Sequence, residues 1–336
     1  MDILNLITAK DRVGFSKAYN YQTDFLGDKL FPNKPKTENL EVEFEQLLAG
    51  STIPVMAKVK PLDTETPIGD RPNFETVKLS KMLIAEKINQ TERIMLALRG
   101  NKDHTTITDF IFNDAHNMVS RVLTRKEVMR MELLSTGIVT ARENEGNVIV
   151  DYRMNQQNKP VLSDWSNPDA DILGDLRRVQ EISKDLGIEI NKALTSGTIL
   201  GFIMANNGVR NAMAGLLGTN FFSESDVIKW LQSKFGIVFR SYDKGYKTSI
   251  DGATQRFYPA NKITFFGGSG AIGSGLHGYT AEDLKEYSSF KKELKEAYVT
   301  VSMWDTPDPV ATWTRASSIY IPVVNNINDM IIATIQ

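Results

Sequence analysis

The sequence predicts an α+β fold, and three observations lead to this class. Residues 105–134 carry the pattern of one long helix, and residues 137–152 carry the pattern of a β-hairpin. Residues 168–304 then alternate between segments typical of helices and segments typical of strands. With 336 residues, the chain is long enough for one large or two medium domains.

The composition argues against several kinds of functional site. The chain has 39 lysines and arginines against 41 aspartates and glutamates, a net charge of −2, so no basic excess indicates a nucleic-acid ligand. It has no cysteine, which excludes disulfides, thiolate metal sites and cysteine nucleophiles and fits a reducing cytoplasm. The three histidines, at positions 104, 116 and 277, are too dispersed to predict a zinc site or a histidine-based triad. We therefore expect no metal and no cofactor.

The chain shows no sign of a membrane segment. No apolar run approaches the roughly 18 residues that a membrane-spanning helix needs. The first residues carry charges and no long apolar core, which is not the pattern of a signal peptide. We expect a protein that does not associate with membranes.

The first 80 residues predict an arm followed by an extended ribbon. Residues 1–49 have mixed character, and residues 51–79 place four prolines between stretches of alternating polarity. Proline confines strands to edges and turns, so this segment is not a central sheet. With a tip near Gly69-Asp70, two extended arms would reach ~45 Å from their root. Because a two-stranded ribbon is marginally stable in water, we expect it to lie on another surface.

The long helix and the hairpin follow. Thr106 to Asp109 read as a capping box that begins the helix, and Gly137 reads as its C-terminal stop. His116 is expected on the exposed face of this helix. After it, residues 137–142 and 147–152 predict two strands joined by a turn at 143–146.

The second half predicts alternating helices and strands. An amphipathic helix is expected over 171–182, a buried strand over the unbroken apolar run 198–204, and a short asparagine-capped helix over 209–214. Ser223 to Asp226 read as a capping box that opens a further helix. Strands are expected at 237–242 and 262–266.

A glycine motif follows the last of these strands. Gly268, Gly270 and Gly273 match the dinucleotide-binding pattern G-x-G-x-x-G. In that motif the third glycine opens a helix whose N-terminus binds the pyrophosphate. Here Gly275 and Gly278 follow closely, which makes a helix improbable. We interpret the motif as a structural loop, and a nucleotide-binding enzyme that uses residues 268–273 is the alternative.

Other catalytic motifs are absent from the sequence, and the pairs of neighbouring acidic residues have simpler explanations than catalysis. No nucleophile elbow and no Walker loop occurs. The neighbouring acids are interpreted as helix-start or turn residues: Asp169 with Asp171, Asp305 with Asp308, and Glu143 with Glu145. We expect Trp304 and Trp313 to be core or interface anchors.

Several segments, in this order and spacing, resemble one known family. They are Phe25–Phe31, Thr198–Gly208, Phe257–Gly267, Asp308–Pro322 and Asp329–Ile335. Together with the arm, ribbon and long helix, they are similar to the major capsid proteins of tailed phages, specifically the lambda-type major head protein (capsid protein E) family. The resemblance implies the Hong-Kong-97-type capsid fold. It also places the glycine loop where the family has a structural loop after a strand.

The resemblance implies a division of the chain into five parts. These are an N-terminal arm over residues 1–49, an extended loop over 50–80, a peripheral domain with its spine helix over 81–167, an axial domain over 168–304, and returning strands of both domains over 305–336.

The function that the resemblance implies is structural and not enzymatic. Copies would assemble into pentamers and hexamers and form an icosahedral shell around double-stranded DNA, without sequence-specific binding. Assembly would take place in the host cytoplasm, and the protein would reside in the virion capsid. A scaffolding protein and a portal are the implied partners, and a decoration protein is a further one. The lambda-type branch does not cross-link its subunits. An encapsulin-like, non-viral compartment shell is the alternative within the same fold.

The extended loop carries the charges that we expect at contacts between subunits. They are Lys58, Lys60, Asp63, Glu65, Asp70 and Arg71. On a neighbouring copy, such charges could fix the register of the contact. The simpler explanation is that they are solvated, since exposed ion pairs contribute about 0–1 kcal/mol.

Overall fold

The fold was analysed in a computed structural model of the chain. It describes residues 24–47, 56–57, 74–91, 104–143, 146–217, 222–268, 270–284, 290–294, 298–307 and 310–336. The chain divides into two compact units. Unit 1 comprises Met1–Val42, Leu79–Met129 and Gly273–Val323, and unit 2 comprises Glu43–Lys78, Arg130–Ile272 and Val324–Gln336.

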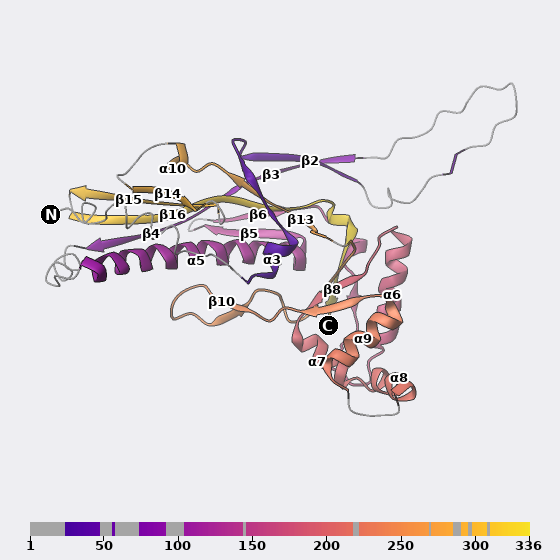
Figure 1. The fold of residues 1–336 in the computed structure, drawn as a ribbon. Coiled ribbons are helices and arrows are strands. Elements are labelled where there is room, and N and C mark those ends of the chain that lie inside the picture. The colour runs from indigo at the N-terminus through magenta and orange to yellow at the C-terminus, as the bar shows by residue number, and fades with distance from the viewer. Residues whose placement is uncertain are drawn as a thin grey trace, which may run out of the picture. The chain divides into compact units, whose positions relative to one another are not determined.

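Unit 1 is built on a six-stranded sheet. Its strands run in the order β1-β13-β16-β15-β14, and β4 pairs with β16 (Figure 1). Their bounds are β1 Asn33–Thr37, β4 Met82–Thr91, β13 Gly273–Gly278, β14 Phe290–Leu294, β15 Val299–Pro307 and β16 Val310–Val324. Because β16 pairs antiparallel with both β4 and β15, it is the central strand that holds this sheet together.

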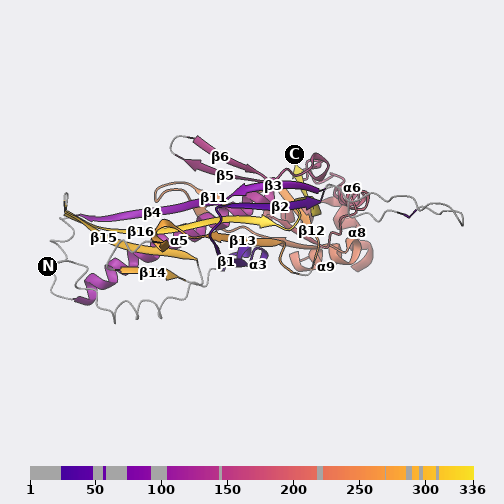
Figure 2. The ribbon, with the colours of Figure 1, turned by 90° about the horizontal axis from the view of Figure 1, so that it is seen from above.

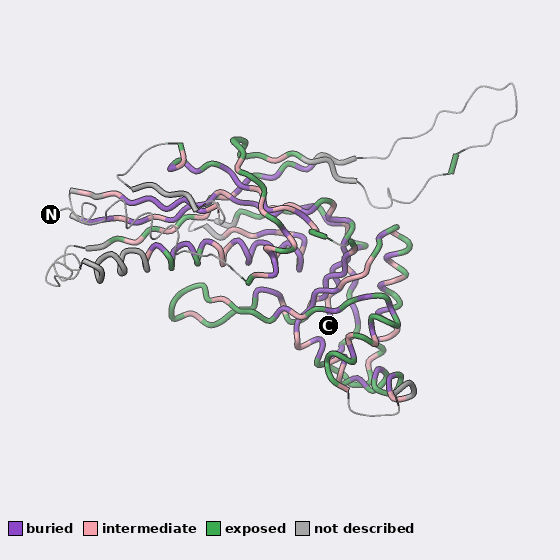
Figure 3. Tube along the Cα trace, in the orientation of Figure 1, coloured by how far each residue is buried: buried purple, intermediate pink, exposed green. Residues whose placement is uncertain are grey.

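The long helix α5, His104–Thr136, supplies the hydrophobic partner of this sheet. Met118, Val119 and Val122 on the helix form one buried cluster with Val299 and Val301 of β15 and with Ala316 of β16. Figure 2 shows the helix running along β4, β15 and β16, and Figure 3 shows the buried stripe that it contributes. The short helices α3, Leu26–Leu30, and α10, Ala281–Leu284, complete the described part of unit 1.

The predicted helix over 105–134 is confirmed, and so is the exposed position of His116. Gly137 ends it with φ of 74°, in the left-handed region that glycine adopts without strain. The predicted capping box was misplaced. The helix already begins at His104, so Thr106 lies inside the first turn and not before it.

Unit 2 is built on a five-stranded sheet with the order β7-β17-β12-β8-β9. Its strands are β7 Val161–Leu162, β8 Lys192–Thr195, β9 Val238–Ser241, β12 Lys262–Phe266 and β17 Met330–Ile335. Four helices among the described residues lie wholly in this unit: α6 Ile172–Asp185, α7 Gly197–Ala205, α8 Asn207–Leu217 and α9 Glu224–Phe235. Figures 1 and 2 show α6, α8 and α9 grouped together. One hydrophobic cluster joins the helices to the sheet, for example Leu176, Ile203 and Leu231 to Phe265 and Ile331.

The remaining elements of the described residues are hairpins and single turns. The hairpins are β5 Ile138–Glu143 with β6 Gly146–Asp151, which confirms the predicted one, and β10 Gly245–Lys247 with β11 Thr254–Arg256. The single turns are η1 Gln156–Asn158 and η2 Ile327–Asp329.

Strands β2, Glu41–Leu47, and β3, Phe74–Ser80, form a two-stranded sheet. Pairing at the root of the expected ribbon therefore begins at residue 41, inside the segment that we expected to be the arm.

The local signals of unit 2 are mostly confirmed. Asp171 caps α6 by accepting from the Gly174 N–H, and Ser223 and Asp226 form a reciprocal capping box at the start of α9. The asparagine cap of α8 is Asn206, whose Oδ1 accepts from the Val209 N–H at 3.0 Å. Strands β9 and β12 lie where the sequence predicts them.

The buried strand predicted over 198–204 is wrong, because this segment is helix α7. An unbroken apolar run fits a buried helix as well as a buried strand. The deciding residue stands just before it: Ser196 accepts from the Ile199 N–H and begins the helix.

The sheet of unit 1 also groups residues that we expected apart. Strands β13, β14 and β15 join β16, so residues 273–304 lie in unit 1, whereas the predicted axial domain runs over 168–304. Pairing between strands far apart in sequence leaves no local signal. The named domains and their bounds stay a prediction.

Two glycines that end helices give a matched test of packing in unit 2. Gly137 and Gly236 have φ of 74° and 70°. A Cβ at Gly137 would lie 3.2 Å from the Met154 Cβ, whereas a Cβ at Gly236 would meet nothing within 4 Å. Gly236→Ala should therefore lower the free energy of unfolding by about 1 kcal/mol through backbone strain alone. Gly137→Ala should lower it by about 1–2 kcal/mol more, through overpacking. Urea unfolding measures both, and equal losses would contradict the packing argument.

Candidate functional site

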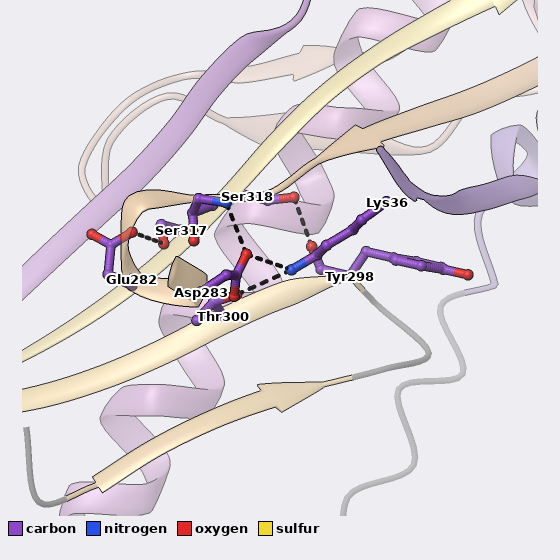
Figure 4. A network of polar contacts seen from close by, with 8 residues as sticks. Lys36, Glu282, Asp283, Tyr298, Thr300, Ser317 and Ser318 are labelled. Carbon is purple, nitrogen blue, oxygen red and sulfur yellow. Dashed lines mark hydrogen bonds and ion pairs between the residues drawn. The ribbon is translucent and has the colours of Figure 1, made fainter. Parts of the chain in front are cut away.

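The candidate site is a buried polar network in unit 1, on the sheet face opposite α5. Because side chains alternate along a strand, Thr300 on β15 points away from Val299 and Val301, which contact the helix side. Its cross-strand partner on β16 is Ser317, and both are buried. The charged members come from β1, α10 and β16 and from Lys81, directly before β4, and Figure 4 labels three of them, Lys36, Glu282 and Asp283. We call this set the root network, and its members are Asn33, Lys36, Lys81, His277, Glu282, Asp283, Tyr298, Thr300, Arg315 and Ser317.

The centre of the root network is an ion pair between β1 and α10. The Lys36 Nζ lies 2.8 Å from Oδ2 of Asp283, and the two side chains are only 5% and 6% exposed. The Thr300 hydroxyl donates to Oδ1 of Asp283 at 2.6 Å, and the Thr280 N–H donates to Oδ2 at 2.8 Å. Figure 4 shows the Lys36 ammonium group beside both Asp283 and Thr300, to each of which it donates. Both oxygens of the carboxylate are thus satisfied, as a buried charge requires.

The surroundings of Asp283 determine its protonation state. Burial raises the pKa of this carboxyl group, and hydrogen bonds from Lys36, Thr300 and the Thr280 N–H more than offset that effect. The net result is a pKa below the ordinary value of 3.8. Asp283 is therefore held as a carboxylate and cannot act as a general acid near neutral pH.

A second carboxylate of α10 binds the central strand β16. Glu282 accepts from Arg315 at 2.6 Å and from the Ser317 hydroxyl at 3.2 Å. Both acids lie in the first turn of α10, and nothing in this local sequence indicates that they point into the sheet.

The start of β1 is fixed by an aromatic and amide cluster. The Asn33 side chain lies 3.1 Å from Nε2 of His277, and the His277 ring stacks on the Tyr298 ring with centroids 4.4 Å apart. Tyr298 has φ of 51°, a strained value for a bulky residue, and its carbonyl accepts from the Ser318 hydroxyl at 2.8 Å. These contacts position β1 beside β13, to which it pairs in parallel with an irregular register.

This arrangement is suited to holding chain segments together and not to catalysis. Lys36, Asp283 and Glu282 are buried and paired with opposite charges, and Asp283 is held as a carboxylate. Within the described part of the chain, no group of three or more histidine, aspartate or glutamate side chains could hold a metal ion. No helix among the described residues is long and apolar enough to cross a membrane.

The six charges that we expected at subunit contacts lie outside the described residues. Lys58, Lys60, Asp63, Glu65, Asp70 and Arg71 all fall within 58–73. They stay a prediction. The network that does appear was not predicted, because its members come from five separate segments.

The two tryptophans expected to be anchors form a cross-strand pair. Trp304 on β15 faces Trp313 on β16, with ring centroids 6.4 Å apart and planes 11° apart. The ammonium group of Lys87 lies 4.6 Å above the Trp313 ring, which is a cation–π contact. Both rings are partly buried, and whether they anchor an interface stays a prediction.

The glycine motif lacks the helix that a nucleotide site needs. Residues 273–278 form strand β13, so no helix N-terminus follows Gly273. The expected loop is confined to the residues before this strand. Gly275 and Gly278 serve close packing: a Cβ at these positions would lie 2.8 Å from the Tyr320 ring and 2.8 Å from Ile319, respectively.

Comparisons with known proteins agree on one assignment. The family model described as phage major capsid protein E matches residues 16–335. A solved prophage protein from Escherichia coli, described as a capsid protein, is similar with a TM-score of 0.59 and 11% identity over 97% of this chain and 98% of that chain. A phage-related protein from Bordetella bronchiseptica is similar with a TM-score of 0.54 and 13% identity over 96% of this chain and 94% of that chain. No curated protein sequence matches the chain.

The ion pair of the root network predicts a pH-dependent stability. Because the pKa of Asp283 is lowered in the folded state, its contribution is present above the ordinary pKa of 3.8 and is lost as the pH falls below it. Asp283→Asn should lower the free energy of unfolding by about 3 kcal/mol at pH 7. This difference from wild type should shrink as the pH falls from 4 towards 3, as urea unfolding at each pH would measure.

The control is Asp251→Asn in the exposed turn of the β10–β11 hairpin. It should change the free energy of unfolding by less than about 0.5 kcal/mol at any pH. A difference between wild type and Asp283→Asn that stays constant with pH would mean that the charge on Asp283 contributes nothing.

Proposed function

The chain belongs to the phage major capsid protein E family, and from this premise we propose that its copies close through pentamers and hexamers into an icosahedral shell around double-stranded DNA. It is a structural protein of the phage head with the Hong-Kong-97 capsid fold, and it is not an enzyme. A capsid protein forms a shell from many copies of itself, and its place is the virion capsid. Head-to-tail contacts that close into rings are the simplest way to build such a shell.

The observation that carries the proposal is the two-stranded root of the segment 41–80. Strands β2 and β3 pair only with each other among the described residues. Two strands alone bury little apolar surface and are marginally stable in water. We therefore assign the 50–80 segment as an extended loop that lies across a neighbouring copy, where it would add area to the interface. Lys58, Lys60, Asp63, Glu65, Asp70 and Arg71 are its proposed contact residues.

We further assign the two units to the two domains of the fold. Unit 1 would be the core of the peripheral domain, with α5 as the spine helix, and unit 2 the core of the axial domain around the symmetry axes. Pairing of β13 and β15 with β16, and of β14 with β15, supports a peripheral position for residues 273–304.

The remaining partners follow from the family and from the charge of the chain. Assembly in the host cytoplasm with a scaffolding protein and a portal, and addition of a decoration protein, are proposals. A net charge of −2 favours a wall that encloses DNA without binding it tightly. An encapsulin-like shell would differ by enclosing protein cargo, and no observation favours it. A nucleotide-binding enzyme is excluded by the structural role of the family.

Replacement of residues 58–73 by a short glycine-serine linker tests the extended loop. The linker leaves β2 and β3 in place, so the subunit should fold with a circular dichroism spectrum and melting temperature close to those of wild type. Shells should be lost, because the contact across neighbouring copies is removed. Negative-stain electron microscopy of purified protein, with and without a scaffolding protein, gives the readout.

The matched control reverses a charge at the root of the loop, outside the replaced residues 58–73, with Lys78→Glu on β3. Lys78 forms an exposed pair with Glu43, with side chains 65% and 54% exposed. It should assemble like wild type, since exposed pairs contribute little. Normal shells from the linker variant would contradict the proposed role of the loop. Wild-type protein that stays monomeric in every condition would contradict self-assembly itself.

A further inference from the structure

Lys81 occupies a special place in the chain, at the base of the segment 41–80. It is the only residue between β3, which ends at Ser80, and β4, which begins at Met82. Leu40 stands at the other end, directly before β2. The Lys81 N–H donates to the Leu40 carbonyl at 2.9 Å, so one backbone hydrogen bond closes the base of the whole excursion.

The side chain of Lys81 reinforces this closure from inside unit 1. Its Nζ donates to the Thr37 hydroxyl at 2.5 Å, to the Asn39 carbonyl at 2.6 Å and to the His277 carbonyl at 3.1 Å. An ammonium group has three protons to donate, and each has an acceptor here. Two acceptors belong to the chain that leads into β2, and the third belongs to β13.

The setting is unusual for a lysine. The residue is only 8% exposed, and the three oxygens that accept from it carry no formal charge. Burial lowers the pKa of Lys81 below 10.5. An unfolded lysine keeps its proton up to higher pH, so the buried ammonium group costs stability at neutral pH, and this cost disappears as the pH rises through the window between the two pKa values.

The buried charge of Lys81 lowers the stability of the fold, yet all three of its donors are satisfied. Such a residue is best explained by a role in positioning chain segments. We infer that Lys81 is the positioning residue of the extended loop, because it ties both ends of the 41–80 segment to β13. The inference rests on the proposed function, since the position of the loop matters only if the loop docks on a second copy of the chain. Without Lys81, the core of α5 and β16 would remain, but the two ends of the segment would separate.

Three variants separate this role from general stabilisation. Lys81→Met keeps the length of the side chain and removes all three donors, and Lys81→Arg keeps the charge and donors. Lys78→Met is the matched control, a lysine of the same ribbon whose exposed side chain pairs with exposed Glu43. Hydrogen exchange measured by mass spectrometry reports opening of the base, and electron microscopy with sedimentation reports the fraction of protein in shells.

In Lys81→Met, exchange over residues 37–43 and 79–82 should accelerate by about tenfold or more, while residues 118–134 of α5 keep wild-type rates. The fraction assembled into shells should fall by about tenfold. Lys81→Arg should restore part of both properties, and Lys78→Met should match wild type. Wild-type exchange at the base in Lys81→Met would overturn the inference, and so would fast exchange combined with normal assembly.

A second variant covers the case in which Lys81→Met does not fold. Thr37→Val removes one acceptor and leaves the lysine in place, so exchange at the base should accelerate to a smaller extent. Wild-type exchange in Thr37→Val would then overturn the inference. The exchange measurement needs no assembly, so failure of the wild type to form shells would count against the proposed function and not against the role of Lys81 at the base.

Discussion

The buried ion pair between Lys36 and Asp283 is the interaction on which the arrangement of unit 1 depends. It joins residues 247 positions apart, at an N–O distance of 2.8 Å. Desolvation of two charges costs more than their attraction returns unless the remaining hydrogen-bonding groups are also satisfied. Thr300 and the Thr280 N–H meet this requirement for Asp283. Strand β1 therefore has one register in which the buried Lys36 is paired with a carboxylate.

The position of β1, fixed by this pair, in turn determines the base of the 41–80 segment. Once β1 is fixed, Thr37 and Asn39 are in place to accept from Lys81, and the Lys81 N–H can reach Leu40. The hydrophobic cluster of α5 with β15 and β16 stabilises the body of unit 1, and its described members do not include residues of this base. A capsid subunit needs a stable core and also a fixed base for the 41–80 segment. A stable core alone would not present an extended segment to a neighbour in a defined position.

Local signals made much of the fold readable from the sequence, and non-local contacts account for the rest. Gly137 and the capping box of Ser223 marked helix ends correctly, because each acts within a few residues. The run 198–204 was misassigned since its apolar side chains carry no period and the cap at Ser196 lies outside it. The root network could not be predicted, since Lys36 contacts Asp283 and Thr300, which lie more than 200 residues later in the chain. The ribbon charges, from Lys58 to Arg71, could be proposed from composition alone and stay a prediction.

A double-mutant cycle on Lys36 and Asp283 tests the central claim most directly. The free energy of unfolding is measured for wild type, Lys36→Met, Asp283→Asn and the double variant. If the pair fixes β1, the two substitutions should be coupled by about 1.5 kcal/mol or more, as found for close charge pairs. Losses that add to within about 0.3 kcal/mol would show that the two side chains act independently, and would contradict the account.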